Sequence, residues 1–262
     1  MNKSSVLHSL CVAVLLVLSA AIALVLTDIS HSTQIPAAAE SLTELSVTET
    51  EAETTQQTTV PIPTVEIVYD EYETDIEQEN FNKAVIIGNS QAQALSNYGL
   101  IKEADFITRI GLSVNKVLTA SEGEPLINEL YGTDYDKVIL VFGENELGWP
   151  YPKNFISEYK KVINEIREIL PDATIYCHAV FPVTKSHSEK DTIGVNNENV
   201  ALFNELIKEM CEEEGYEFIM YSDAFSEDNG ALPESVANDG VHFNYDYCKI
   251  WASELSKVLS EE

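Results

Sequence analysis

Between Lys83 and Leu259, short apolar runs alternate with longer amphipathic segments, and this alternation constrains the fold more than any other feature. Five runs have the length and composition of buried strands: Lys83–Gly88, Asp105–Ile110, Lys137–Phe142, Ala173–Phe181 and Tyr216–Tyr221. Helices are expected between and after them, at Ser90–Tyr98, Val114–Ala120, Asn154–Leu170, Asn196–Glu214 and Tyr245–Leu259. Apolar strands joined by helices indicate a five-stranded parallel sheet with both faces covered, in a single α/β domain.

A second apolar feature lies near the N-terminus, where Val6–Leu26 is long enough to cross a bilayer core of roughly 30 Å as a helix. Lys3 precedes this run and the next Lys or Arg is Lys83, so the positive-inside rule predicts a cytoplasmic N-terminus and an exported remainder. A cleavable export signal is the alternative, because Ala21-Ile22-Ala23 offers small residues for cleavage. We therefore expect residues 1–26 to form a membrane anchor or signal segment. The rest of the chain is then extracellular, either on a single-pass membrane protein or secreted.

Residues 27–80 separate this segment from the predicted domain at 81–262. They are rich in Thr, Glu, Ser and Gln, include Pro61 and Pro63, and end in a run of acidic side chains. No helical or strand periodicity is present, so the chain gains too little apolar burial to offset the entropy of ordering. The sequence predicts a disordered acidic stalk.

The charge and the cysteines exclude several classes of protein. Lys and Arg total 15 and Asp and Glu total 44, which gives a formal net charge of −29. A field of this sign repels phosphate backbones, so we expect no nucleic-acid partner. The four cysteines form no CxxC and no zinc-finger spacing with His, and we expect no metal and no cofactor. An exported location would permit a disulfide between Cys211 and Cys248, on different predicted helices, which leaves Cys177 over.

Polar residues follow three of the predicted strands and precede the last predicted helix. Sites in open parallel sheets form beyond the carboxyl ends of the strands, so these residues are expected to lie together. They form four blocks: Gly88-Asn89-Ser90, Gly111, Gly143-Glu144-Asn145-Glu146 and Asp239-Gly240-Val241-His242. The blocks supply a hydroxyl, a glycine, an amide side chain and an acid–base pair.

Ser90 stands where a strand turns into a helix. Free backbone N–H groups and the positive end of the helix dipole would stabilise an oxyanion there, although the position also suits a helix N-cap. Asp239 and His242 are three residues apart, a spacing that lets the carboxylate orient the imidazole as a base, although Asn238-Asp239-Gly240 is also good turn chemistry. Asn145 and Gly111 could donate N–H groups to an oxyanion, or could simply make turns.

Together the four blocks resemble those of the SGNH (GDSL-type) hydrolase superfamily. The resemblance covers about residues 83–259 and implies a flavodoxin-like three-layer α/β/α sandwich and ester hydrolysis through an acyl-enzyme. It implies that Ser90 is the nucleophile, His242 the base and Asp239 its orienting acid, with Ser90, Gly111 and Asn145 forming the oxyanion hole. Two positions depart from the family pattern, because Asn89 replaces the usual Asp and Glu146 replaces another Asp.

The competing α/β-hydrolase fold fits less well, because Ala92 occupies the last glycine of its Gly-x-Ser-x-Gly turn and Ser90 follows the first strand. We therefore expect an extracellular serine esterase that cleaves O-acyl esters of small molecules or of a wall or extracellular glycan. A catalytically silent binding module and an O-acyltransferase with the same triad remain as alternatives. Trp149 and Tyr151 could line the substrate pocket, and the polar segment Thr184–Gly194 is expected to be a solvated loop able to act as a flap.

Overall fold

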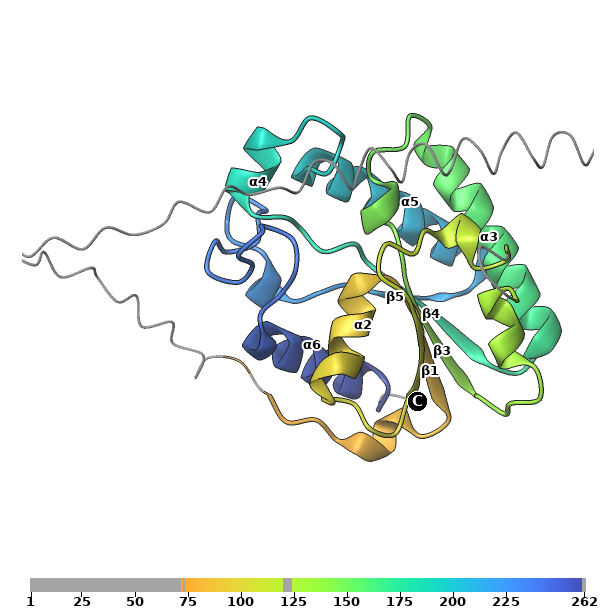
Figure 1. Ribbon diagram of the computed structural model, residues 1–262. Helices are drawn as coiled ribbons and strands as arrows, with labels where there is room; N and C mark the ends of the chain where they lie inside the picture. Colours follow the sequence, from red (N-terminus) through yellow and green to blue (C-terminus); the bar gives the residue numbers. More distant parts are fainter. Residues whose placement is uncertain (1–71, 73, 120–123, 261–262) are drawn as a thin grey trace, which may run out of the picture. The chain divides into compact units, whose positions relative to one another are not determined.

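The computed structural model describes residue 72, residues 74–119 and residues 124–260 (Figure 1). The predicted anchor at 1–26 and all of the predicted stalk except residues 72 and 74–80 lie outside this part of the chain. Among the described residues, no helix has both the length and the apolar character needed to span a bilayer.

A five-stranded parallel sheet forms the centre of the domain, as the sequence predicts. Its strands stand in the order β2-β1-β3-β4-β5. Their bounds are β1 Ala84–Gly88, β2 Asp105–Thr108, β3 Lys137–Val141, β4 Thr174–His178 and β5 Glu217–Ile219. Gly88 at the end of β1 pairs with Thr108 on one side and Val141 on the other, so three strands end at the same level. The loops that follow these strands therefore start from a common edge.

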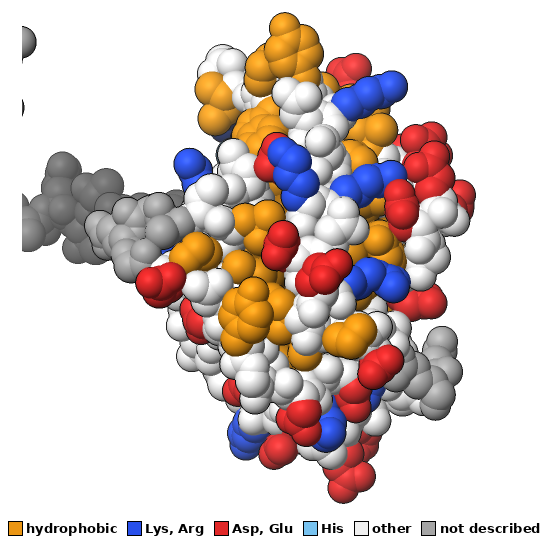
Figure 2. Space-filling model, turned by 90° about the vertical axis from the view of Figure 1, so that its right-hand side faces the viewer, with side chains coloured by type: hydrophobic (Ala, Val, Ile, Leu, Met, Phe, Trp, Pro, Cys, Tyr) orange, Lys and Arg blue, Asp and Glu red, His pale blue; other side chains and the backbone are white. Residues whose placement is uncertain are grey.

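Helices cover both faces of the sheet, which confirms the three-layer sandwich (Figure 1). α2 Ser90–Tyr98 and α6 Tyr245–Val258 lie on one face, and α3 Pro152–Ile169 and α5 Asn197–Glu214 on the other. Alternate residues of β1 pack into two separate cores, Val85 and Ile87 into one and Ala84 and Ile86 into the other. This double burial explains why the strands are apolar throughout. The side of the molecule that carries α3 has acidic and basic side chains interspersed (Figure 2).

Two short segments differ from the prediction. Where the sequence predicts a helix at Val114–Ala120, the structure has only the 3-10 turn η3 Val114–Lys116. The two apolar residues Val114 and Val117 are both buried, and a single turn is enough to bury them. The polar loop expected at Thr184–Gly194 contains the helix α4 Lys185–Lys190. The hydroxyl of Thr184 caps this helix by accepting a hydrogen bond from the backbone N–H of His187.

The folded part begins earlier than the predicted boundary at residue 81. The 3-10 turn η2 Gln78–Phe81 lies against α6, where the backbone N–H of Glu77 donates to Ser256 Oγ at 3.0 Å. Asn80 Nδ2 donates to the carbonyl of Ser256 at 2.9 Å, and Tyr72 and Ile76 pack against the core. A few apolar residues in an otherwise polar segment are therefore enough to dock its end.

The three described cysteines are free thiols. Cys177 and Cys211 lie in the core under α3 and α5, whereas Cys248 lies in the core on the opposite face of the sheet. The sheet therefore separates Cys211 from Cys248, and the disulfide that an exported location would permit between them does not form.

Candidate active site

Ser90 is the first residue of α2, directly after the turn that leaves β1. The helix N-cap is Asn89, whose side chain accepts a hydrogen bond from the backbone N–H of Gln91 at 3.0 Å. The Ser90 hydroxyl is therefore not used as the cap, and its backbone N–H lies in the first turn, where the helix offers no acceptor. A Cβ at Gly88 would lie 2.7 Å from the carbonyl oxygen of Val141, so only glycine fits where this turn passes β3.

The Ser90 hydroxyl contacts the imidazole of His242, although 152 residues separate them in the sequence. Ser90 Oγ lies 2.9 Å from His242 Nε2, and His242 Nδ1 lies 2.7 Å from Asp239 Oδ2. A carboxylate can only accept, so the proton of the neutral ring stays on Nδ1 and Nε2 is left to accept from the hydroxyl. The three side chains form a relay that can remove a proton from Ser90.

Asp239 is fixed by its own turn. Its Oδ1 atom accepts the backbone N–H groups of Val241 at 2.9 Å and of His242 at 2.8 Å. Partial burial would raise the pKa of Asp239, but these bonds and the one to the ring of His242 outweigh it and lower that pKa to about 2. The carboxylate is therefore ionised at neutral pH and can stabilise a protonated imidazole.

Asn145 contacts the loop that carries Gly111. Asn145 Nδ2 donates to the carbonyl of Leu112, the residue after Gly111, at 3.1 Å. The second hydrogen on that nitrogen remains available, and Gly111 has a φ of 68°, a left-handed conformation that suits glycine. The loops after β2 and β3 therefore bring the two predicted oxyanion donors together.

Glu146, one of the two departures from the family pattern, holds these loops in place. Its fully buried carboxyl accepts the backbone N–H of Val114 at 2.5 Å and that of Gly143 at 3.0 Å. Burial raises the pKa of Glu146 to about 7, against the lowering effect of these backbone hydrogen bonds. The longer side chain thus spans the two loops and keeps their backbones satisfied.

Glu144 is a site residue that the sequence reasoning missed. Its Oε1 atom lies 4.0 Å from His242 Nε2, and its side chain is only 14% exposed. Burial raises the pKa of Glu144, while the charge of His242 and a hydrogen bond from Gln91 lower it. The only signal in the sequence is its place beside Asn145, and a charged residue in a loop normally indicates solvent exposure. His242 therefore has a carboxyl group on each side of its ring.

Trp149 and Tyr151 stand apart from this relay. They line a cleft with Asn115, Pro150 and Asn154 that contains none of Ser90, Asp239 and His242. Trp149 packs partly against the core beneath α3, and Tyr151 is 69% exposed. Their predicted contact with substrate remains a prediction.

The fold and the relay define a class of protein: a parallel α/β sandwich with a Ser-His-Asp relay at the carboxyl edge of its sheet, as in the SGNH hydrolases. The chain belongs to the GDSL-like lipase/acylhydrolase family, whose model matches residues 86–246, more than half of the chain.

Similar proteins agree with this assignment. The isoamyl acetate-hydrolyzing esterase of Saccharomyces cerevisiae is 31% identical over 77 residues, 29% of this chain and 32% of that enzyme, so the match spans about a third of the relative's length. A structure from Streptococcus pneumonia whose name refers to platelet activating factor matches with a TM-score of 0.59 and 19% identity, over 68% of this chain and 84% of that one. A catalytic mutant of an acetylxylan esterase from Geobacillus stearothermophilus matches with a TM-score of 0.52 and 16% identity, over 68% and 94%. At these identities the two structures establish the fold alone.

Proposed function

We propose that this protein is a serine esterase that hydrolyses O-acyl esters through an acyl-enzyme. The observation that carries the proposal is the continuous relay from Ser90 Oγ through His242 to Asp239, with steps of 2.9 and 2.7 Å. These distances are those at which a general base can take a proton from a nucleophile.

The relay assigns a role to each group in the reaction. Ser90 Oγ attacks the ester carbonyl while His242 Nε2 takes its proton, and Asp239 stabilises the resulting imidazolium. The negative charge on the carbonyl oxygen is stabilised by the backbone N–H groups of Ser90 and Gly111 and by Asn145 Nδ2. The oxyanion then collapses, the alcohol leaves with the proton from His242, and Ser90 carries the acyl group. Water repeats the sequence, with His242 as its base, and releases the acid and free Ser90.

The substrate and the location belong to the same proposal. The apolar run at residues 6–26, with Lys3 before it and no Lys or Arg between it and Lys83, favours an exported domain on a membrane anchor, or a secreted one. An enzyme in that location meets acylated wall or extracellular glycans. Two similar proteins are named for acetate esters, isoamyl acetate and acetylxylan, which supports a short acyl group.

The test is hydrolysis of p-nitrophenyl acetate by the full chain and by its Ser90→Ala variant. We expect the variant to lose at least about 10³-fold of the rate, because it has no nucleophile. A variant that keeps the wild-type rate would exclude Ser90 from the chemistry.

Two further measurements separate the alternatives. Covalent labelling of Ser90 by a fluorophosphonate requires an activated hydroxyl, so an unlabelled folded protein would favour a silent binding module. Product analysis with a sugar acceptor distinguishes hydrolysis, which releases free acid, from acyl transfer, which gives an acylated sugar.

A further inference from the structure

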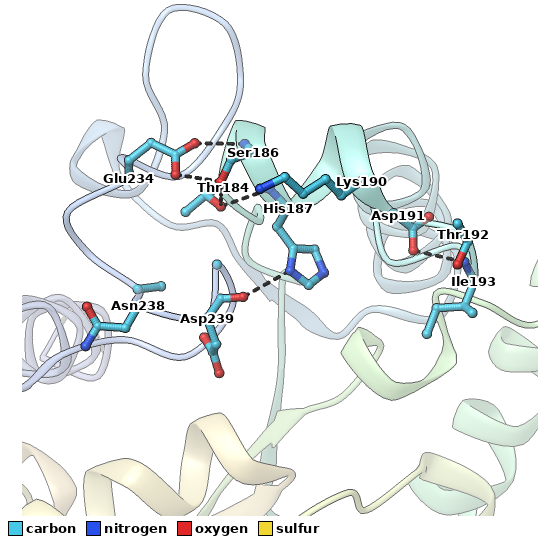
Figure 3. A pocket seen from close by; sticks show the side chains of 12 residues that line it. Thr184, Ser186, His187, Lys190, Asp191, Thr192, Ile193, Glu234, Asn238 and Asp239 are labelled. Atoms are coloured by element: carbon cyan, nitrogen blue, oxygen red, sulfur yellow. Dashed lines mark hydrogen bonds between the residues drawn. The ribbon is translucent and has the colours of Figure 1, made fainter.

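A cleft of about 490 Å³ opens between α4 and the turn that carries the acid–base pair (Figure 3). Asp239 and Gly240 line it on one side, and Thr184–Ile193 lines it on the other. Its lining includes neither Gly111 nor Asn145, and it shares no residue with the cleft beside Trp149. Of the three relay residues, only Asp239 lines this cleft, which therefore adjoins the relay at its acid end.

The wall formed by α4 is attached to the relay turn at its first residues. The backbone N–H of Thr184 donates to the carbonyl of Gly240 at 2.9 Å, and His187 Nδ1 donates to the carbonyl of Asp239 at 3.1 Å. The packing leaves no free space, since a Cβ at Gly240 would lie 2.6 Å from the Cβ of His187.

The other end of the same wall reaches the loop that carries Asn145. A Cβ at Gly148 would lie 2.2 Å from the carbonyl oxygen of Ile193, and Asn199 Nδ2 donates to the carbonyl of Leu147 at 3.2 Å. The segment from Thr184 to Gly194 thus forms an arch from the acid–base turn to the oxyanion loop. A molecule in the cleft beneath this arch lies beside the turn that carries Asp239.

Hydrogen bonds hold the arch within itself and to the opposite wall, and its role as a flap remains a prediction. The carboxylate of Asp191 accepts backbone hydrogen bonds from Ile193, Gly194 and Val195 at 2.9 to 3.0 Å, and one from the side chain of Asn196 at 3.0 Å. On the opposite wall, Glu234 accepts from the backbone and the hydroxyl of Ser186, both at 2.8 Å. Both carboxylates are occupied by the protein, so the cleft is shaped before any ligand arrives.

The groups that remain for a ligand are polar and include both hydrogen-bond donors and hydrogen-bond acceptors. His187 uses Nδ1 as a donor, so its Nε2, which faces into the cleft in Figure 3, is an acceptor in the neutral ring. Lys190, Thr192 and Asn238 add donors and acceptors, whereas Ile193 and Ala237 are the only aliphatic side chains in the lining. Three carboxylates against one lysine leave the wall negative, so it repels anionic ligands.

We propose that this cleft binds the alcohol part of the ester, and that this alcohol is a neutral polyhydroxylated molecule such as a sugar ring. The inference rests on the proposed esterase function, because it needs an ester whose carbonyl lies at Ser90. Hydroxyl groups match a wall that offers donors and acceptors together. A branched or long alkyl alcohol would leave those groups unpaired, and a phosphate-bearing alcohol would face the negative wall.

The experiment compares three acetate esters that differ only in the alcohol: 6-O-acetylglucose, isoamyl acetate and 1-acetylglycerol 3-phosphate. We expect kcat/KM of the full chain for the sugar ester to exceed that for each of the others by at least about tenfold, the discrimination that a few unpaired polar groups provide. The alcohol part of p-nitrophenyl acetate is a flat ring without sugar hydroxyls, so its hydrolysis reports the chemistry without the hydroxyl contacts proposed for the cleft.

Two variants test the cleft directly. Thr192→Val and Lys190→Met remove a hydroxyl and an ammonium group from exposed side chains, so both proteins are expected to fold. We expect each to raise KM for 6-O-acetylglucose about fivefold or more and to leave p-nitrophenyl acetate hydrolysis within about twofold. Lys153→Met, an exposed lysine on α3, is the matched control and is expected to change neither.

The outcomes separate the two proposals. Hydrolysis of p-nitrophenyl acetate without preference for the sugar ester would overturn the assignment of the cleft and leave the esterase standing. Equal losses on both substrates in the cleft variants would also overturn it, because they indicate a structural role. No hydrolysis of any ester would remove the proposed function and this inference together.

Discussion

Glu144 Oε1 lies 4.0 Å from His242 Nε2, the same ring nitrogen that lies 2.9 Å from Ser90 Oγ. A carboxyl and a hydroxyl thus face one proton-accepting atom, while Asp239 occupies the other ring nitrogen. In its ionised form Glu144 stabilises the protonated imidazole that forms when His242 takes the proton of Ser90.

Replacement of Glu144 by Gln should lower kcat for p-nitrophenyl acetate. The groups that face the imidazole are Glu144, Asp239 and Ser90, with the neutral Gln91 beside Glu144, so the variant removes one of two carboxyls. The imidazolium of the transition state is then stabilised by Asp239 alone, and we expect a loss of about tenfold. Steady-state kinetics with p-nitrophenyl acetate measure it.

The matched control is Glu158→Gln, which removes a carboxylate on α3, 31% exposed, that pairs with Lys161. Its kcat should equal that of the wild type. A loss of the same size in both variants would assign the effect to overall charge and not to Glu144.

Asp239→Asn should abolish most activity without unfolding the turn. The amide oxygen of Asn can still accept the backbone N–H groups of Val241 and His242, so the free energy of unfolding should change by less than about 1 kcal/mol. The amide cannot hold a proton on Nδ1 or stabilise the imidazolium, and in other Ser-His-Asp relays this change lowers kcat about 10⁴-fold. Activity within tenfold of the wild type would show that Asp239 does not orient His242.

Gly240→Ala should destabilise the same turn, because the added methyl group would clash with α4 and its N-cap. Gly240 has a φ of 84°, and its missing Cβ would lie 2.6 Å from His187 Cβ and 2.7 Å from Thr184 Oγ1. We expect a loss of about 2–4 kcal/mol in the free energy of unfolding, since both backbone strain and a clash must be relieved.

Gly230→Ala is the control for this variant, because Gly230 has a φ of 76° but no atom within 4 Å of its missing Cβ. Only strain remains there, and we expect about 1 kcal/mol. Chemical denaturation of both variants gives the comparison, and equal losses would mean that the contact with α4 can relax.

Most of this fold can be predicted from the sequence because each helix and strand is marked by a local pattern of apolar residues. The strands are continuous apolar runs, α3 has five buried positions at helical spacing, and the ends of parallel strands must share one edge. That edge predicted where Ser90 and Asn145 lie, and the spacing of Asp239 and His242 predicted their contact.

The parts that the sequence did not reveal depend on contacts between distant loops. Glu144 becomes a partner of His242 only because β3 ends beside β1, and no local pattern marks a charged loop residue as buried. The arch is similar: its polar sequence is typical of a solvated loop, and only the tertiary hydrogen bonds of His187 and Thr184 attach it to the turn that carries Asp239.

His178, buried at the end of β4, should make stability depend on pH. Trp251 Nε1 donates to His178 Nε2 at 2.9 Å, and His178 Nδ1 donates to the carbonyl of Ala179 at 2.6 Å, so both ring nitrogens are used by the neutral form. Burial lowers the pKa of His178 to about 4, against a usual 6.5. Between pH 6.5 and about 4, His178 is therefore protonated in the unfolded chain and neutral in the folded chain.

The free energy of unfolding should consequently fall as the pH drops from about 6.5 to about 4, by up to about 3 kcal/mol from this group. His178→Leu removes the titration, so the variant should be less stable near pH 7, where Trp251 loses its acceptor, but should have a flatter profile below pH 6.5. Urea unfolding at several pH values measures both proteins, and an unchanged slope in His178→Leu would assign the acid sensitivity to other groups.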